Sequence, residues 1–169
     1  YIPRLAAIAR LRLSTSGVWG ISGLPWRRCT LGSRYPDSIP VVVSMGDYAA
    51  SGGYYICCGA DYIYAEPTTL TGSIGIFGVI PSVSKVRNKI GLDIDGVSTN
   101  KHADLEVNMI YKGMDNSERA LMQEMVERGY DLFTKRCAQG RHVEQSYIQS
   151  IGEGRVWLGA KGKEIGIVD

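Results

Sequence analysis

The sequence Ser51-Gly52-Gly53 is the part of this chain whose residue types are best suited to chemistry. It follows an apolar, β-branched run and opens a small-residue segment, residues 49–60, that we expect to be helical. A serine hydroxyl at a helix start lies near the positive end of the helix dipole, and the next amide can donate to an oxyanion. Glycines there let a substrate carbonyl approach the backbone. The pattern is that of a nucleophile, or of a serine that only caps its helix.

A serine nucleophile needs a base, because its hydroxyl is a weak nucleophile at neutral pH. His142 is expected at the surface, whereas His102 stays a candidate base. A neutral lysine is the other solution, if burial or a cationic neighbour lowers its pKa. The candidates are Lys85, Lys89, Lys101 and Lys112. Lys85 and Lys89 lie four residues apart in an expected helix, where we expect them to be exposed.

Strands and helices alternate along most of the chain, which predicts an α/β fold. We expect strands at residues 39–45, 61–67, 93–97 and 155–157, and a glycine-rich loop at 71–78. We expect a turn at 46–48 and helices at 49–60, 82–90, 115–138, 143–151 and 160–165.

The longest expected helix has its own start signal and one apolar stripe. Asp115 and Glu118 form a capping-box pattern at its beginning. Apolar residues at spacings of three and four then predict a face that packs in the core. They are Met122, Val126, Tyr130, Phe133 and Cys137.

The composition describes an ordinary globular domain: 169 residues, 44% hydrophobic, 21% charged and a net charge of +2. The four cysteines have no zinc-site spacing, so we expect small buried side chains and no metal. No apolar run reaches the roughly 20 residues of a membrane-spanning helix.

The charge is unevenly distributed. Residues 1–38 contain six arginines, no lysine and one acid, a net charge of +5, whereas the remainder has a net charge of −3. We expect an atypical Arg-rich segment at 1–38 and a separate domain at 39–169. A basic nucleic-acid patch is the alternative for the first segment, but scattered arginines without stacking motifs do not favour it, and no nucleic-acid partner is expected.

Several motifs of residues 39–169 resemble, in order and spacing, the signal peptide peptidases of the SppA type. They are Val-Val-Val-Ser-Met-Gly at 41–46, Ala-Ala-Ser-Gly-Gly-Tyr at 49–54, Leu-Thr-Gly-Ser-Ile-Gly at 70–75, Gly-Arg-Val-Trp at 154–157 and Gly-Ile-Val-Asp at 166–169. The resemblance implies a crotonase/Clp-protease-like fold of stacked β-β-α units. It also implies a serine endopeptidase that degrades released signal peptides or other extended apolar peptides by a Ser–Lys dyad.

Carried over to this chain, the resemblance assigns the catalytic roles. Ser51 becomes the nucleophile, and Ser73, 22 positions later, orients the base lysine. Lys101, 50 positions after the serine, is the candidate general base, and a base from another repeat of a longer protein is the alternative. The expected oxyanion and substrate contacts come from Gly52, Gly53 and Gly72.

The resemblance further implies a homo-oligomer, no cofactor, and membrane association through a segment absent here, facing the periplasm or another extracytoplasmic side. The family's Ser-Pro-Gly-Gly turn, which supplies a second oxyanion donor, has no counterpart before Ser51. Loss of one such donor costs about 10²–10³ in rate, so we expect impaired activity.

Two other functions stay open. One is an inactive structural half of the oligomer, with Tyr54, Tyr55 and the glycine loop packing between subunits. The other is an acyl-CoA enzyme on the same fold, which would need carboxylates, and only Asp47 flanks the serine closely.

Overall fold

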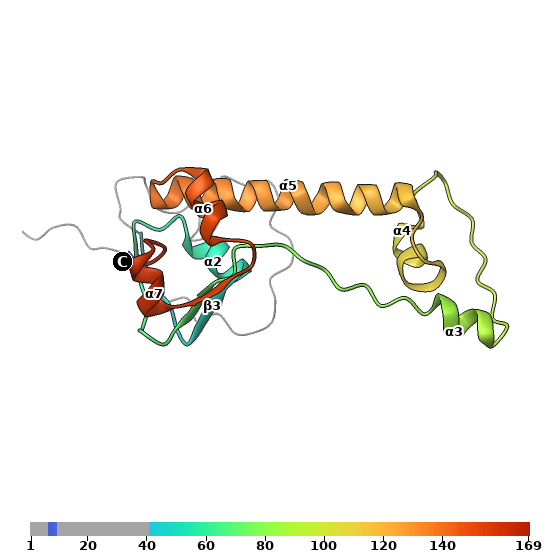
Figure 1. Cartoon of the computed structure of the whole chain (residues 1–169), viewed down its shortest axis with the longest axis horizontal. Helices are drawn as coiled ribbons and strands as arrows, with labels where there is room; N and C mark the ends of the chain where they lie inside the picture. Colours follow the sequence, from blue (N-terminus) through green and yellow to red (C-terminus); the bar gives the residue numbers. More distant parts are fainter. Residues whose placement is uncertain (1–6, 10–40) are drawn as a thin grey trace, which may run out of the picture. The chain divides into compact units, whose positions relative to one another are not determined.

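The computed structural model describes residues 7–9 and 41–169. The chain divides into two compact units, one made of the residues up to Ile76 together with Tyr130–Asp169, the other of Phe77–Gly129. One continuous helix, α5 (Asn116–Arg141), contributes residues to both units (Figure 1). The predicted division at residue 38 falls among residues outside this description and stays a prediction.

The first unit contains two three-stranded sheets. In one, β1 (Ala7–Ala9), β2 (Val41–Ser44) and β4 (Tyr62–Tyr64) are parallel, in the order β1-β2-β4. In the other, the order is β3-β5-β6. There β3 (Tyr48–Ala50) and β5 (Leu70–Gly72) are parallel, and β6 (Val156–Leu158) is antiparallel to β5. With the helices between them, these strands confirm the α/β class.

The core of this unit forms around the short helix α2 (Gly52–Cys57), which follows β3 directly. Tyr54 is fully buried, and its hydroxyl donates to the carbonyl of Ile167 at 3.0 Å. The ring of Phe133 in α5 meets that of Tyr55 edge to face, with centroids 5.1 Å apart. The burial predicted for the cysteines is confirmed for Cys57, Cys58 and Cys137, whereas Cys29 lies outside the described residues.

Two further helices complete the first unit, α6 (Gln145–Ile151) and α7 (Gly159–Glu164). Both were expected from the sequence, within a few residues of these bounds. Ile148 of α6 is buried in the core, and Gly162 of α7 is packed tightly, because a Cβ at its position would lie 3.3 Å from Ile167 Cγ1.

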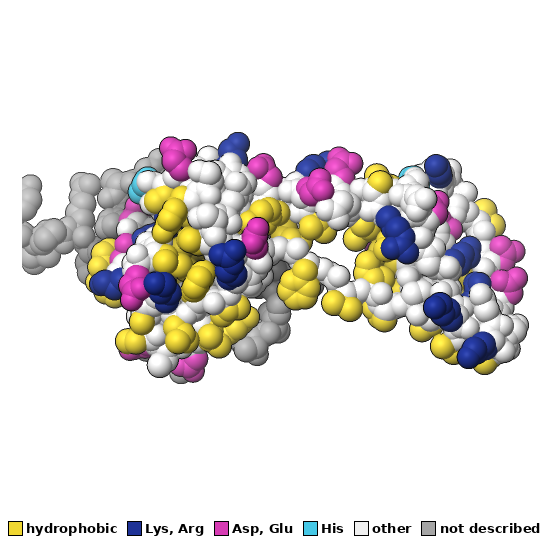
Figure 2. Space-filling model, viewed as in Figure 1, with side chains coloured by type: hydrophobic (Ala, Val, Ile, Leu, Met, Phe, Trp, Pro, Cys, Tyr) yellow, Lys and Arg dark blue, Asp and Glu magenta, His cyan; other side chains and the backbone are white. Residues whose placement is uncertain are grey.

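The second unit holds α3 (Ser84–Lys89), the single turn α4 (Leu105–Val107) and the π-helical turn η1 (Asn108–Lys112). None of its residues belongs to the buried hydrophobic core. Figure 2 shows hydrophobic side chains at the surface among lysines and arginines. Those of this unit with at least half of their surface exposed are Phe77, Val79, Val86, Ile90, Leu92, Val97 and Met125.

The capping box at the start of α5 is confirmed in both directions. The amide of Glu118 donates to Asp115 Oδ1 at 2.7 Å, and the amide of Asp115 donates to Glu118 Oε2 at 2.8 Å. The helix then continues three residues beyond the predicted end, to Arg141. Of the predicted apolar stripe, only Phe133 and Cys137 are fully buried, because the amino-terminal half of α5 belongs to the second unit.

Four expectations about local structure are wrong or incomplete. Tyr48–Ala50 is a strand rather than a turn running into a helix, and the expected loop begins with strand β5. Both segments extend because each supplies the other's backbone partners, which no local pattern reveals. The strand expected at 93–97 is absent, and α4 with η1 was not foreseen.

Candidate active site

Ser51 is the single residue that connects β3 to α2, and its backbone conformation is unusual. Its φ is 53° and its ψ is −120°, a region that non-glycine residues rarely occupy. Such a conformation costs on the order of 1–3 kcal/mol and persists only where neighbours enforce it. Here the amide of Ser51 donates to the carbonyl of Gly72 at 2.9 Å, and its carbonyl accepts from the amide of Tyr55 at 2.9 Å.

This geometry decides between the two roles considered for the serine. A capping serine has an extended backbone and accepts a first-turn amide through its hydroxyl. Ser51 has neither property: its side chain makes no capping hydrogen bond and is half-buried. The capping role is therefore wrong. The amide of Gly52 belongs to the first turn, which has no intrahelical acceptor, and donates to no other group in the described part of the chain.

Ser73 follows the strand that pairs with the one before Ser51. The register pairs Ala49 with Thr71 and Ala50 with Gly72, and both strands end there. Ser51 donates its amide to the carbonyl of Gly72, the residue directly before Ser73. Adjacent strands lie about 4.8 Å apart. The spacing of 22 residues noted in the sequence is thus the offset of a strand pair. Ser73 also has a positive φ, 50°, and its amide donates to the carbonyl of Arg155 at 2.7 Å.

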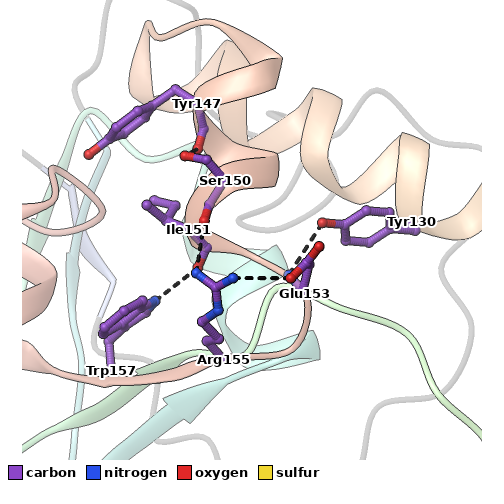
Figure 3. A network of polar contacts seen from close by, with 7 residues as sticks. All are labelled: Tyr130, Tyr147, Ser150, Ile151, Glu153, Arg155 and Trp157. Carbon is purple, nitrogen blue, oxygen red and sulfur yellow. Dashed lines mark hydrogen bonds and ion pairs between the residues drawn. The ribbon is translucent and has the colours of Figure 1, made fainter.

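A polar network that the sequence did not reveal supports the strand next to Ser73 (Figure 3). Trp157 Nε1 donates to the carbonyl of Ile151 at 3.1 Å, and Arg155 Nη1 donates to that of Ser150 at 2.8 Å. The end of α6 thereby receives donors for two of its last carbonyls, which a helix leaves without partners. The same two hydrogen bonds anchor β6 and the residue just before it, Arg155, whose carbonyl accepts from the amide of Ser73.

Gly72 is buried, and no larger residue fits its position. Its φ is +75°, and a Cβ there would lie 2.8 Å from Trp157 Cδ1 and 3.2 Å from the carbonyl oxygen of Arg155. Its carbonyl is the acceptor that holds the Ser51 amide. Gly52 and Gly53 are half-buried at the start of α2. Contacts of these three glycines with substrate or oxyanion stay predictions.

The four candidate lysines lie in the second unit. Lys101 is exposed and lies in a turn before α4, so its pairing with Ser51 stays a prediction. Lys85 and Lys89 are exposed on α3, as expected, and Lys112 is exposed in η1. Of the histidines, His142 is exposed, as predicted, whereas His102 Nε2 lies 3.1 Å from Ser117 Oγ.

Thiols are not rival nucleophiles in this part of the fold. Burial, with a smaller effect from Cys58, raises the pKa of Cys57 to about 12. Burial likewise raises the pKa of Cys137. A buried thiol with a raised pKa is a poor nucleophile. Within residues 41–169 and 7–9, no group of His, Cys, Asp and Glu side chains could hold a metal ion.

Comparison with known sequences identifies the family. The model of peptidase family S49 matches residues 34–169. The chain belongs to peptidase family S49. This confirms the resemblance to SppA-type proteases that the motifs around Ser51 and Ser73 indicated. The match includes both strained serines and the β6 segment that supports them.

The relatives of this S49 chain include named proteases. Protease 4 of Salmonella typhi is 41% identical over 167 residues, which is 99% of this chain and 26% of that protein. The chloroplastic serine protease SPPA of Arabidopsis thaliana is 34% identical over 164 residues, 97% of this chain and 24% of that protein. A putative signal peptide peptidase SppA of Enterococcus faecium is 33% identical over 132 residues, 78% of this chain and 38% of that protein.

The S49 chain therefore spans about a quarter of the length of the first two relatives. The Salmonella alignment reaches into residues 1–38, and the family match begins at residue 34. Among the described helices, none is both long enough and apolar enough to cross a membrane.

Proposed function

We propose that this chain carries the nucleophile of a Ser–Lys peptidase of the signal peptide peptidase type. The observation that carries the proposal is the strained conformation of Ser51 at the β3–α2 turn, where its amide is held by the carbonyl of Gly72, next to Ser73. A serine on a sharp strand-to-helix turn presents its hydroxyl outward, beside a free helix amide. Family membership makes peptide bonds the natural substrate.

In the proposed reaction, Ser51 Oγ attacks the peptide carbonyl carbon while a neutral lysine amine takes the hydroxyl proton. The Gly52 amide stabilises the resulting oxyanion. The tetrahedral intermediate collapses, the C–N bond breaks, and the leaving amine receives the proton from the lysine ammonium. Water, deprotonated by the same lysine, then hydrolyses the ester and restores Ser51. Ser73 would donate a hydrogen bond that orients the lysine.

Lys101 is our candidate for this base, and its exposure favours a second function. If no lysine of the whole protein reaches Ser51, the chain is a structural half of its assembly. Tyr54, which that alternative used for packing between subunits, is fully buried within its own chain and is not available. Replacing Lys101 by Met tests the base: lost turnover supports Lys101, and normal turnover means that the base comes from another repeat. A parent protein without peptidase activity would support the structural half.

The substrate would be an extended, uncharged peptide such as a released signal peptide. Residues 67–84, which include Ser73, contain no charged side chain, and this suits an apolar peptide. The acyl-CoA alternative is disfavoured, because the family is a peptidase family and Asp47 is exposed in the turn before β3.

We further propose that the two sheets belong to crotonase/Clp-like stacked units. The order β2-β3-α2 is followed by β4-β5, and like strands of these successive pairs are parallel neighbours in the two sheets. Homo-oligomer formation is supported by the exposed apolar side chains of residues 77–129, which need cover. Attachment to a membrane on its extracytoplasmic side would require another part of the whole protein.

The test is Ser51→Ala in the full-length protein that carries this chain. Cleavage of a fluorogenic, extended apolar peptide with small residues at the scissile bond should fall by at least about 10³-fold. The circular dichroism spectrum and Tm should stay close to those of the parent, because alanine has the same Cβ.

Ser146→Ala is the matched control, since Ser146 is exposed on α6 and lies outside the proposed site. Its turnover should equal that of the parent. Turnover retained in the Ser51→Ala protein would refute the nucleophile assignment.

A further inference from the structure

The turn that carries Lys101 is tied to the first turn of α5 by side chains for which the mechanism above gives no role. His102, the next residue, has its Nε2 atom 3.1 Å from Ser117 Oγ. The backbone of the same turn is closed locally: the amide of His102 donates to Asn100 Oδ1 at 3.2 Å, and that of Ala103 donates to the Asn100 carbonyl at 3.3 Å. Lys101 thus lies inside a short closed turn, and the next residue in that turn, His102, contacts α5 through its ring.

The helix turn that receives His102 is itself rigidly held. Glu118 is only 3% exposed, and its carboxylate accepts from Asn108 Nδ2 at 2.6 Å and from the amide of Asp115 at 2.8 Å. Asn108 lies in η1, so Glu118 joins the segment after Lys101 to α5. Charge-assisted hydrogen bonds of this kind are the strong ones in proteins.

The ring of His102 depends on Ser117 for its orientation. Its Nδ1 atom is buried and has no hydrogen-bond partner in the described part of the chain. The contact between Nε2 and Ser117 is therefore the ring's one hydrogen bond to the described residues. Loss of the Ser117 hydroxyl would free the ring to rotate.

The charged groups around this cluster are also close to Lys101. The amide of Glu118 holds the pKa of Asp115 below its ordinary value, burial opposes this, and the Ser117 amide, Lys101 and His102 lower it further. Lys101 and His102 therefore each act electrostatically on Asp115 at the start of α5. A Lys101 side chain held by this turn stays close to Asp115.

We propose that His102 and Ser117 are positioning residues for Lys101, and that their hydrogen bond fixes the turn from which the lysine acts. The inference rests on the proposed function. Neither residue needs to contact substrate. Catalysis by a base requires placement of its nitrogen, and a displacement of about 1 Å can cost up to 10²-fold in rate.

The experiment measures kcat, KM and the pH dependence of kcat/KM for the full-length protein and its variants. His102→Ala and Ser117→Ala should lower kcat by about 10- to 100-fold with KM unchanged. The midpoint of the rise of kcat/KM with pH should move to lower pH, because a displaced Lys101 loses the neighbouring Asp115 carboxylate, which favours the ammonium form. His102→Gln should restore most of kcat, since its amide can still bond Ser117.

His142→Asn is the matched control, because His142 is an exposed histidine with a positive φ that asparagine tolerates. Its kinetics and pH midpoint should equal those of the parent. If His102→Ala and Ser117→Ala lower Tm but leave the pH midpoint in place, the two residues are only structural and the inference is overturned.

Lys101→Met distinguishes this failure from failure of the proposed function. Retained activity in Lys101→Met would overturn the lysine assignment and the inference with it. Lost activity there, together with an unmoved midpoint in His102→Ala, would overturn the inference alone.

Discussion

At the scale of the residue, Ser51 carries the strongest functional signal, because its backbone is in a conformation that serine avoids. The amide of Ser51 is held by Gly72 and its carbonyl by Tyr55, so the strained turn is fixed from both sides. Structural serines have no need of such a conformation. Strain of this kind is tolerated where it presents a side chain for chemistry.

The strain makes a prediction about stability. The unfolding free energy of Ser51→Gly should exceed that of Ser51→Ala by about 1 kcal/mol, because glycine occupies positive φ freely whereas alanine keeps the strain. Ser51→Gly should therefore unfold at a higher denaturant concentration. Both variants lack the hydroxyl and should be inactive. Urea unfolding followed by tryptophan fluorescence measures the difference. If Ser51→Gly is the less stable of the two, the turn is not strained.

At the scale of the element, strand β5 organises the site. It pairs with β3 and β6, and the residues that follow or precede these strands hold the two serines: the Gly72 carbonyl accepts from Ser51, and the Arg155 carbonyl accepts from Ser73. Gly72 lies close to both neighbouring strands. Its carbonyl accepts from the amide of Ser51, which follows β3, and a Cβ at its position would clash with Trp157 of β6. The site therefore depends on close backbone packing as much as on reactive groups.

Gly72→Ala should disturb this meeting point. A Cβ would clash with the Trp157 ring and Arg155 carbonyl, and alanine disfavours φ of +75°. We expect a loss of about 1–3 kcal/mol in unfolding free energy and a fall in peptidase activity at temperatures where the variant is folded. Gly46→Ala is the control, because no atom lies within 4 Å of its added Cβ. Equal stability of the two variants would contradict the packing described.

At the scale of the whole molecule, the two units differ in how they are stabilised. The first has a hydrophobic core around Tyr54 and is closed by an ion pair between Arg141 Nη2 and Asp169 Oδ1 at 2.7 Å. The amide of Ile63 also donates to Asp169 Oδ2 at 2.9 Å. The second unit has no buried hydrophobic side chain among its residues and relies on polar clusters such as that around Glu118.

The carboxylate of Asp169, paired with Arg141 and the Ile63 amide, should make the stability of the fold depend on pH. Burial opposes ionisation of Asp169, but the hydrogen bond from Arg141, the Ile63 amide and nearby positive charge outweigh it and lower the pKa. A lowered folded-state pKa stabilises the fold above the unfolded-state value of about 3.9 and loses that stabilisation as the pH falls. Asp169→Asn should therefore cost about 1.5–3 kcal/mol at pH 7 and much less near pH 3.

Thermal unfolding at pH 7 and pH 3 checks this prediction. Glu164→Gln is the control, because Glu164 forms an exposed ion pair with Lys161 that should contribute about 1 kcal/mol or less. A cost for Asp169→Asn that is the same at both pH values would show that its charge is not the cause.

The sequence predicted the parts of this fold that depend on local signals. The capping box at Asp115 and the helix α5 follow from residues a few positions apart, as do β4 and α6. The strand at Tyr48–Ala50 was missed, because small residues without alternation become a strand only when β5 pairs with them. The network of Arg155 and Trp157 was missed because its acceptors are backbone carbonyls, which leave no trace in residue types.

For the candidate site, residue types and spacing by themselves determined that Ser51, with its glycines, and Ser73 are the residues to consider. The tertiary structure decided that Ser51 is not a helix cap, and that the strands before the two serines pair with an offset of 22 residues. The reason is physical: a hydroxyl and two glycines are fixed by covalent chemistry, whereas a positive φ and a strand register are imposed by distant backbone partners.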